Sequence, residues 1–451
     1  MSWHAEEFAA GWDRALVESA PSLAASFRDA MYDARLAFGD RPVCQVLRPL
    51  FVDSDAFERL ARDGARVRRA LSAVAALPGV DEALGFSPAE RALFALDPDD
   101  GEPDAIGRLD AFFGEDGRAR FIEYNGESPG GIAFGDALGE LFEGLEPFTR
   151  LALRPRRIEA KRATLAALLD HHAARLRRRG EAPRAPRGCA IVDFREAKTR
   201  REFELFADFF AGEGLPAIVV DPSELRIEDG TLRAGSLEID LVYRRLLSSD
   251  ILREPERAAT LLEAARADLA CIANGFGGHR LSHKGLFAYL SNPDRRGFRF
   301  DDATEETLAA TVPWTRLVLG DETEPPGGGP RRPLTEILEG DRERLVLKPG
   351  ADYGGRGVTL GWTADDATWG EAVDRAGRER GWIVQERVAI PRRSFPRLDG
   401  GETRLAVDVG PYVVGGSRVV GAGVRLAGGD LLNVSAGSGS AVPMFLVDVE
   451  K

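Results

Sequence analysis

The stretch LVLKPGADYGGRGV, residues 345–358, joins an apolar run that ends in Lys348 to a loop rich in glycine. The apolar run predicts a buried strand, and the glycines allow backbone N–H groups to approach an anion closely. Lys348 and Arg356 would add two positive charges, as on the phosphates of a nucleotide. Although Gly-Gly turns also occur in ordinary hairpins, the stretch predicts a phosphate-binding loop, and its spacing is not that of a Walker A loop. The glycines concerned are Gly354, Gly355 and Gly357.

A second strand is predicted further along the chain, at Trp382–Val388 (WIVQERV). Gln385, Glu386 and Val388 could offer hydrogen bonds and an apolar surface to an adenine ring. The alternative is a half-buried strand on which Gln385 and Glu386 face water. The segment is therefore a candidate adenine site only in combination with the loop before it.

Two earlier segments, RLDAFF at 108–113 and RFIEYN at 120–125, are predicted to pair as a hairpin across a turn at 114–117. Residues two apart in a strand share a face, so the polar residues of both strands can converge. Carboxylate and amide oxygens suit Mg²⁺ that is held together with nucleotide phosphates, and an arginine beside them could stabilise a transferring group. The alternative is an exposed hairpin with ordinary surface charges. The candidate metal ligands are Asp110, Glu123 and Asn125, and the arginine is Arg108.

A further lysine, Lys284, lies in LSHKGLFAYL at 281–290, near the predicted start of a helix with an apolar face. From there it could reach a phosphate, although a solvated lysine is the commoner arrangement. In the C-terminal strands and the tail after them, Arg425 and Asn433 are candidates for contact with phosphates or a substrate. A purely structural role is the alternative for both.

The hydrophobic pattern divides the chain into four regions. Residues 1–105 are predicted to be mainly helical, and 106–180 hold the hairpin and further helices, including a long one over Pro155–Arg179. Residues 185–275 alternate strands and helices, which is typical of a small parallel α/β domain, and they lack the GxGxxG dinucleotide fingerprint. From 280 to 451, short helices precede strands that are expected to be antiparallel at the end. We therefore expect an α/β (α+β) protein.

The composition excludes some classes of function. Sixty Lys+Arg against 73 Asp+Glu give a formal net charge of −13, which disfavours a bulk electrostatic contact with nucleic acid. The three dispersed cysteines form no CxxC pair, and no apolar run reaches the roughly 18 residues of a membrane-spanning helix. The acidic N-terminus does not resemble a secretory signal. We expect a cytoplasmic protein, and nothing in the sequence indicates its oligomeric state.

Taken together and in this order, RLDAFF…RFIEYN, LSHKGLFAYL, LVLKPGADYGGRGV and WIVQERV resemble the circularly permuted branch of the ATP-grasp superfamily, glutathionylspermidine synthase and its relatives in particular. In ordinary ATP-grasp enzymes the metal-binding E-x-N follows the nucleotide-binding lysines, whereas here Glu123-x-Asn125 precedes Lys284 and Lys348. The similarity runs from about Gly107 to about Val442. It implies an ATP-grasp-like nucleotide site between mixed or antiparallel sheets, beside a small parallel α/β domain.

The resemblance also implies an activity, an Mg²⁺-dependent ligase that uses ATP to join a carboxylate to an amine through an acyl phosphate. Asp110, Glu123 and Asn125 match the Mg²⁺ ligands, and Arg108 matches the arginine of the acyl-phosphate step. The positions that match nucleotide-binding residues are Lys284, Lys348, Gly354, Gly355, Arg356, Gly357, Gln385, Glu386 and Val388, with Arg425 and Asn433 as additional candidates.

Two departures from the family bear on the substrates. The chain shows no cysteine signature of the synthase's amidase domain, so only the synthetase part is expected. The loop Gly126–Gly131 (GESPGG) lacks the acidic, Thr-rich character of the synthase loop, which speaks against polyamine and glutathione as substrates. Three alternatives stay open: a small-molecule kinase on the same fold, a non-catalytic nucleotide-binding module, and an α/β protein with coincidental motifs.

Overall fold

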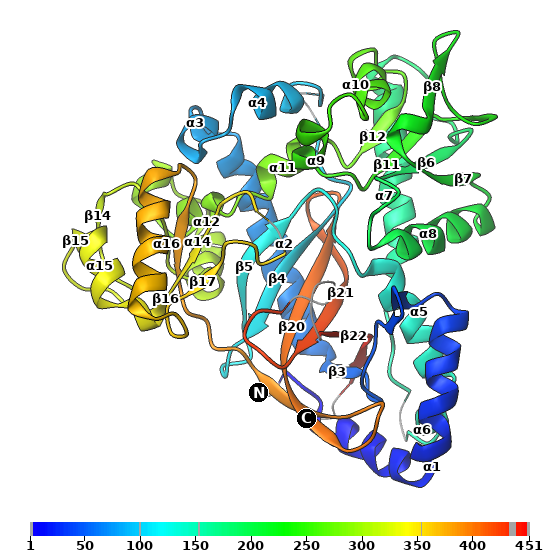
Figure 1. Cartoon of the computed structure of the whole chain (residues 1–451), viewed down its shortest axis with the longest axis horizontal. Coiled ribbons are helices and arrows are strands. Elements are labelled where there is room, and N and C mark those ends of the chain that lie inside the picture. Colours follow the sequence, from blue (N-terminus) through cyan, green and yellow to red (C-terminus); the bar gives the residue numbers. More distant parts are fainter. Residues whose placement is uncertain (1–2, 99–100, 152–153, 353, 433–438, 449–451) are drawn as a thin grey trace.

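A computed structural model describes residues 3–98, 101–151, 154–352, 354–432 and 439–448, and one large sheet lies at its centre (Figure 1). The strand order is β22-β21-β20-β4-β5, and β19 also pairs with β20. The pairings are antiparallel, as expected for the C-terminal strands. The strands are β4 (Ile106–Phe113), β5 (Ala119–Asn125), β19 (Arg392–Pro396), β20 (Glu402–Val414), β21 (Arg418–Ala427) and β22 (Ser440–Val442).

The predicted hairpin is formed by β4 and β5. Arg108 lies opposite Asn125, and Asp110 lies opposite Glu123. The turn is closed by Gly114, whose N–H donates to the carbonyl of Arg118 at 2.8 Å. The hairpin is therefore confirmed, and its four polar candidates lie side by side at the centre of the molecule.

The predicted parallel sheet is also present, with the strand order β12-β11-β6-β7. Helices α7 and α8 pack on one face, where Ile191 and Leu241 are buried, and α9 and α10 pack on the other, where Val192 and Val242 are buried. The alternation of buried faces follows the two-residue period of a strand. The elements are β6 (Cys189–Val192), β7 (Ala217–Val220), β11 (Leu241–Arg244), β12 (Cys271–Ala273), α7 (Ala160–Arg178), α8 (Arg200–Gly212), α9 (Ser248–Arg253) and α10 (Ala259–Arg266).

A third sheet, of order β13-β18-β16-β17, lies on the other side of the central sheet from the parallel one (Figure 1). Its two inner strands are those predicted around Lys348 and Gln385, and they pair antiparallel. Helices α15 and α16 bury their apolar residues against them. The elements are β13 (Thr315–Leu317), β16 (Leu345–Lys348), β17 (Thr359–Leu360), β18 (Ile383–Glu386), α15 (Leu334–Gly340) and α16 (Asp366–Arg378).

The N-terminal region is mainly helical, as predicted, and it also supplies a strand that the hydrophobic pattern did not indicate. Strand β3 (Leu50–Asp53) pairs in parallel with β23 (Met444–Val447), so that the N-terminal region is joined to the last described strand. Asp53 caps the next helix by accepting from the N–H of Ala56. The helices are α1 (Glu6–Asp33), α2 (Ser54–Ala75), α3 (Val80–Leu84) and α4 (Pro88–Phe94).

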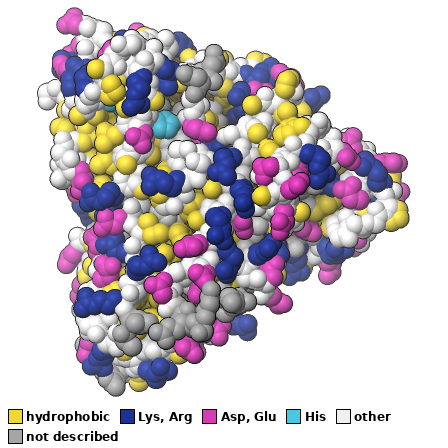
Figure 2. Space-filling model, turned by 180° about the vertical axis from the view of Figure 1, so that it is seen from behind, with side chains coloured by type: hydrophobic (Ala, Val, Ile, Leu, Met, Phe, Trp, Pro, Cys, Tyr) yellow, Lys and Arg dark blue, Asp and Glu magenta, His cyan; other side chains and the backbone are white. Residues whose placement is uncertain are grey.

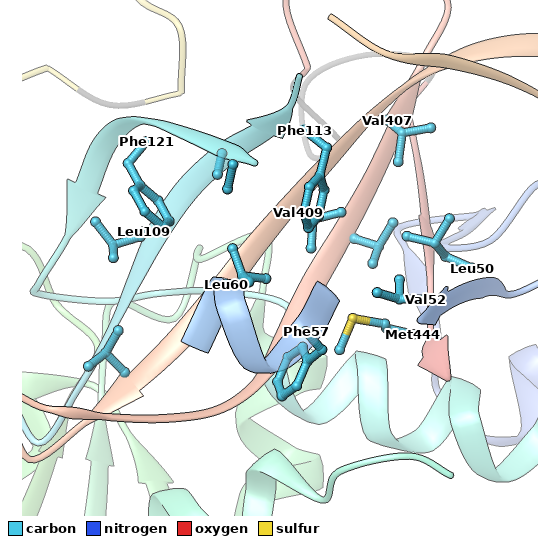
Figure 3. Packing of buried hydrophobic residues seen from close by; sticks show 14 of the residues in the cluster. Leu50, Val52, Phe57, Leu60, Leu109, Phe113, Phe121, Val407, Val409 and Met444 are labelled. Carbon is cyan, nitrogen blue, oxygen red and sulfur yellow. The ribbon is translucent and has the colours of Figure 1, made fainter. Parts of the chain in front are cut away.

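The largest hydrophobic core lies between α2 and the central sheet (Figure 3). Phe57 and Leu60 of α2 belong to the same core as Leu109 and Phe121 of the hairpin, and all four side chains are buried. Burial of such side chains contributes roughly 1.5–3 kcal/mol each. The core therefore fixes the apolar face of the hairpin, which leaves the polar face to the site described below.

One helix boundary differs from the prediction. Helix α7 begins at Ala160, whereas a start at Pro155 was expected. Arg156 instead exchanges backbone hydrogen bonds with Leu446, at 2.8 and 2.6 Å, which keeps this segment extended. The carboxylate of Asp136, from α5 (Ile132–Glu143), then accepts from the N–H groups of Ala160 and Lys161 and caps the helix.

The described helices include none that is long and apolar enough to cross a bilayer. On the face opposite to that of Figure 1, Lys and Arg side chains lie among Asp and Glu side chains (Figure 2). The surface charge on that face is therefore mixed in sign, in keeping with the many ion pairs between arginines and carboxylates across the fold.

Candidate functional site

A cleft of about 1020 Å³ is lined by the central sheet, by loops after β6 and β11, and by the sheet that contains β16 and β18. Asp110 is fully buried and Gly357 is exposed, and neither lines the cleft; Asn433 lies outside the described residues. The cleft brings together most of the residues singled out from the sequence, although they come from distant segments. These are Arg108, Glu123, Asn125, Lys284, Lys348, Gly354, Gly355, Arg356, Gln385, Glu386, Val388 and Arg425.

Two lysines and one carboxylate, Lys284, Lys348 and Glu123, line this cleft. Lys284 Nζ lies 3.4 Å from Glu123 Oε2 and donates to the carbonyl of Asp352 at 2.6 Å. Lys348 Nζ donates to Gln385 Oε1 at 2.7 Å. Burial lowers the pKa of Lys348 to about 8 against the opposing pull of Glu123, and the charge of Lys284 lowers it further. The two lysines thus face a single carboxylate, and phosphate oxygens could pair with them.

The loop after Lys348 has the backbone that its glycines predict. Gly354, Gly355 and Gly357 have φ values of 66°, 75° and 68°, a region that side-chain-bearing residues rarely adopt. Arg356 lies among them and is exposed. Since Lys284 holds the carbonyl of Asp352, the base of this loop is fixed to the same lysine that faces Glu123.

Asp110 is held between two arginines. Arg108 Nε donates to Asp110 Oδ1 at 2.6 Å, and Arg425 Nη2 donates to Asp110 Oδ2 at 2.7 Å. Burial would raise the pKa of Asp110, but Arg108 and Arg425 hold it well below its usual range. Both carboxylate oxygens are therefore engaged, and ligation of a metal by Asp110, which stays a prediction, would require one of these contacts to open.

Glu123 and Asn125 are the residues best placed to hold a metal ion. They lie two apart on β5, are half-buried and line the cleft, and Asn125 Nδ2 has no partner among the described residues. Within the described ranges, no three His, Cys, Asp or Glu side chains form a closed metal site. Mg²⁺ is ordinarily held by one or two protein carboxylates together with substrate phosphates and water. The donor set therefore fits an ion that arrives with a nucleotide.

The predicted adenine strand, β18, uses its polar side chains within the protein. Gln385 lies between Lys348 Nζ and Thr315 Oγ1, to which its Nε2 donates at 3.0 Å. Glu386 Oε1 accepts from the backbone N–H of Trp314 at 2.9 Å. Contact of this strand with adenine stays a prediction, and its hydrogen bonds would come from backbone atoms rather than from these two side chains.

Asp408 is a site residue that the sequence reasoning missed. It lies on β20 in the cleft, and its carboxylate accepts from Arg425 at 3.0 and 2.7 Å. Burial raises the pKa of Asp408 to about 6 against the pull of Arg425, and the neighbouring Asp110 raises it further. The signal in the sequence was a lone carboxylate inside the apolar run LAVDVGPYVV, since a buried charge in such a strand needs a partner.

The cleft continues to the carboxyl ends of the parallel strands, where Asp193 follows β6 and Arg245 follows β11. These strands are neighbours, and the helices after them cover opposite faces of the sheet. In open α/β sheets, ligands bind in the crevice at this point of the strand order. The sequence reasoning gave neither residue a role.

A buried network supports the loop after Asn125. Glu127 accepts from Arg244 Nη1 at 2.9 Å and from Ser248 Oγ at 2.6 Å, and it lies 2.9 Å from His279 Nδ1. The other ring nitrogen of His279 lies 3.1 Å from Glu90. Although burial opposes it, the two carboxylates raise the pKa of His279 to about 9. The imidazole is therefore charged at neutral pH and joins α4 to this loop.

The His279→Gln substitution is expected to lower the free energy of unfolding by about 2 kcal/mol at pH 6. Because the folded pKa lies above the ordinary value of about 6.5, the stabilisation is complete below pH 6.5 and is lost as the pH rises through 9. Urea titrations at pH 6 and pH 9.5 measure the difference. Glu90→Gln, as the control, should weaken this pH dependence without abolishing it; a His279→Gln effect that is equal at both pH values would contradict a charged imidazole.

No model of a known protein family matches the chain. A protein of Frankia casuarinae named "Putative glutamate–cysteine ligase 2-2" is 28% identical over 359 residues, which cover 75% of this chain and 38% of that protein. The chain thus spans less than half of the length of this relative.

Among solved structures, a glutathione synthetase-like effector from Globodera pallida, in its apo form, matches with a TM-score of 0.58 and 11% identity. The match covers 94% of this chain and 96% of the effector. The chain has a glutathione synthetase-like fold. The expected mixed α/β architecture is confirmed at this level, and the cleft described above lies within it.

Proposed function

We propose that the chain is an ATP-dependent ligase that joins a carboxylate to an amine, with Mg²⁺ and ATP bound in the cleft. The observation that carries the proposal is one cleft that holds Lys284, Lys348 and Glu123 beside Asn125 and Arg108, with Lys284 3.4 Å from Glu123, in a glutathione synthetase-like fold. The name of the Frankia relative supports a ligase as well. Its substrates are not carried over, because the match covers 38% of that protein.

The order of the motifs along the chain supports the permuted form of the ATP-grasp arrangement. Glu123-x-Asn125 precedes both lysines in sequence, yet it meets them in the cleft. Such a site depends on where the hairpin, the lysines and the glycine-rich loop lie in space, and not on their order along the chain. We therefore propose a circularly permuted site in which the metal-binding hairpin comes first.

In the proposed reaction, the carboxylate attacks the γ-phosphate of ATP, ADP leaves, and an acyl phosphate forms. The amine then attacks the acyl carbon, loses a proton and displaces phosphate. Lys284, Lys348 and Arg356 would neutralise phosphate charge, and Arg108 would stabilise the tetrahedral oxyanion. The candidate Mg²⁺ ligands are Asp110, Glu123 and Asn125, and a bound Mg²⁺ would supply further positive charge at the β- and γ-phosphates.

The far end of the cleft supports an anionic substrate. Arg245 is buried, and its guanidinium donates to Tyr243 Oη and to the carbonyl of Pro129, each at 2.9 Å. Among the described residues, it forms no ion pair with a carboxylate. Glu202 and Asp193 attract its charge without forming an ion pair, and a substrate carboxylate would add a direct one. Arg108 and Arg245 bind the carbonyls of consecutive residues, Gly130 and Pro129, so both guanidinium groups border one loop.

The test is ADP release from ATP and Mg²⁺ with pairs of carboxylates and amines, glutamate and cysteine among them, followed by mass spectrometry of the product. The ligase predicts release that requires both compounds, and a product that weighs their sum less one water. ADP formed with one compound alone, with that compound phosphorylated, would indicate the kinase alternative. Binding of ATP without ADP release from any pair would indicate a nucleotide-binding module.

A further inference from the structure

We infer that Asn274 is a positioning residue that sets Arg108 and Asn125 in place relative to Lys284, and so tunes the affinity of the site for Mg²⁺–ATP. The inference rests on the proposed function for the identity of the ligand. Asn274 follows β12 of the parallel sheet, and its side chain is fully buried. It lies outside the cleft, so it would act through other residues.

The amide of Asn274 holds both strands of the hairpin at its open end. Oδ1 accepts from the N–H groups of Ala105 and Ile106 at 2.9 and 3.2 Å. Nδ2 lies within hydrogen-bond distance of the carbonyls of Ile106, Gly126 and Glu127, at 2.6, 2.8 and 2.9 Å. One side chain therefore bridges the start of β4 and the chain directly after β5.

These contacts lie next to the functional residues. Ile106 is two residues before Arg108, and Gly126 directly follows Asn125. Arg108 and Asn125 lie opposite each other in the hairpin. The turn at 114–117 closes the hairpin at its distal end, and Asn274 joins the two strands at the proximal end, next to these two side chains.

A second contact comes from the same segment as Asn274. The N–H of Gly126 donates to Ser282 Oγ at 2.8 Å, and Ser282 Oγ donates to the carbonyl of Gly278 at 2.8 Å. A Cβ at Gly278 would lie only 2.4 Å from the carbonyl oxygen of Gly126, so the two backbones approach as closely as glycine permits. Helix α11 (Gly277–Leu281) is thereby pressed against the end of β5.

The segment from Asn274 to Lys284 therefore docks on the hairpin at two points and carries the lysine to Glu123. Ser282 is two residues before Lys284, whose Nζ lies 3.4 Å from Glu123 Oε2. Arg244 of β11 anchors the segment at its start by donating to the carbonyls of Asn274 and Gly275, at 2.9 and 2.5 Å. The parallel sheet is thus tied, through Asn274, to the proposed metal and phosphate ligands.

The experiment compares Asn274→Asp and Ser282→Ala with Ser291→Ala, a half-buried serine that bonds to Thr315 and does not touch the hairpin. Asn274→Asp keeps the shape of the side chain but turns its donor toward three carbonyls into an acceptor. Calorimetry measures the Kd of ATP with and without Mg²⁺, and thermal unfolding is followed separately. Supporting residues around metal ligands commonly change metal affinity by about 10–100-fold.

Ser282→Ala is expected to weaken Mg²⁺–ATP binding about 10-fold, and Asn274→Asp at least as much, with a smaller effect on Mg²⁺-free ATP binding. Ser291→Ala should leave both values unchanged. Variants that only lower the unfolding midpoint, with the Kd of Mg²⁺–ATP unaltered, would overturn the inference, and Ser282→Ala decides if Asn274→Asp does not fold. A native chain that binds no Mg²⁺–ATP would instead refute the proposed function, and the inference with it.

Discussion

Replacing Lys348 with methionine is expected to lower ATP-dependent turnover by about 10²–10³-fold, because one preorganised charge on the transferring phosphate is lost. The same change is expected to stabilise the ligand-free protein. Burial disfavours the charged lysine, whose pKa falls to about 8. At pH 7 the folded protein therefore holds a buried charged group, which lowers its free energy of unfolding by up to about 3 kcal/mol.

The pH dependence of this effect has a definite sign. Below pH 8, Lys348 is charged in both the folded and the unfolded protein, so the gain in free energy of unfolding from Lys348→Met is largest there. Between pH 8 and about 10.5, the folded protein loses the proton while the unfolded chain keeps it, and the stability of the native protein rises relative to that of the variant. Urea titrations at pH 7 and pH 9.5 measure the free energy of unfolding of both proteins, and the difference between them should be smaller at pH 9.5.

Lys198→Met is the matched control, because Lys198 is an exposed lysine that lines the same cleft. Lys198→Met should change the free energy of unfolding by no more than about 0.5 kcal/mol, as for ordinary surface substitutions. Unchanged turnover in Lys348→Met would remove this lysine from the nucleotide site. A loss of stability in Lys348→Met at pH 7 would contradict the reading of Lys348 as a cation held in place for a ligand.

Replacing Asp110 with alanine is expected to lower the free energy of unfolding by about 3–5 kcal/mol, because two arginines lose the carboxylate between them. Asp110 is completely buried, whereas Arg108 and Arg425 border the cleft with side-chain exposures of 12% and 22%. Water can reach the two guanidinium groups to that extent, so the lower end of this range is expected. Denaturant unfolding followed by tryptophan fluorescence measures the change.

Asp116→Ala, in the exposed turn of the same hairpin, serves as the control for Asp110→Ala. Asp116 pairs with Arg120, and its side chain is 48% exposed. Exposed pairs of this kind contribute about 0–1 kcal/mol. Equal effects of the two substitutions would mean that the buried pairing of Asp110 with Arg108 and Arg425 does not hold the hairpin in place.

Local patterns predicted the elements of the site well. The apolar run before Lys348, the glycines after it and the hairpin from Arg108 to Asn125 all have the expected backbone. Each of these features depends on residues close in sequence: a two-residue period, a turn, or a positive φ. The parallel sheet could be predicted for the same reason, since its strands and helices alternate at regular intervals.

Contacts between distant segments could not be predicted in this way. The pairing of β3 with β23 joins segments almost 400 positions apart, and no local pattern specifies a partner at that distance. Arg245 directly follows β11, and its partner, the carbonyl of Pro129, comes from a segment 116 positions earlier in the chain. The engagement of Gln385 and Glu386 with Lys348 and Trp314 likewise depends on how strands from three segments are assembled.

The most direct test of the site is calorimetry of ATP binding, with and without Mg²⁺, to the native chain and to Glu123→Ala. Glu123 faces Lys284 and lies beside Asn125 in the cleft, so the site predicts binding that Mg²⁺ strengthens in the native chain. In Glu123→Ala, the strengthening by Mg²⁺ should disappear. The absence of ATP binding under every condition, or a Glu123→Ala variant with the same dependence on Mg²⁺ as the native chain, would contradict the assignment of this cleft as a nucleotide and metal site.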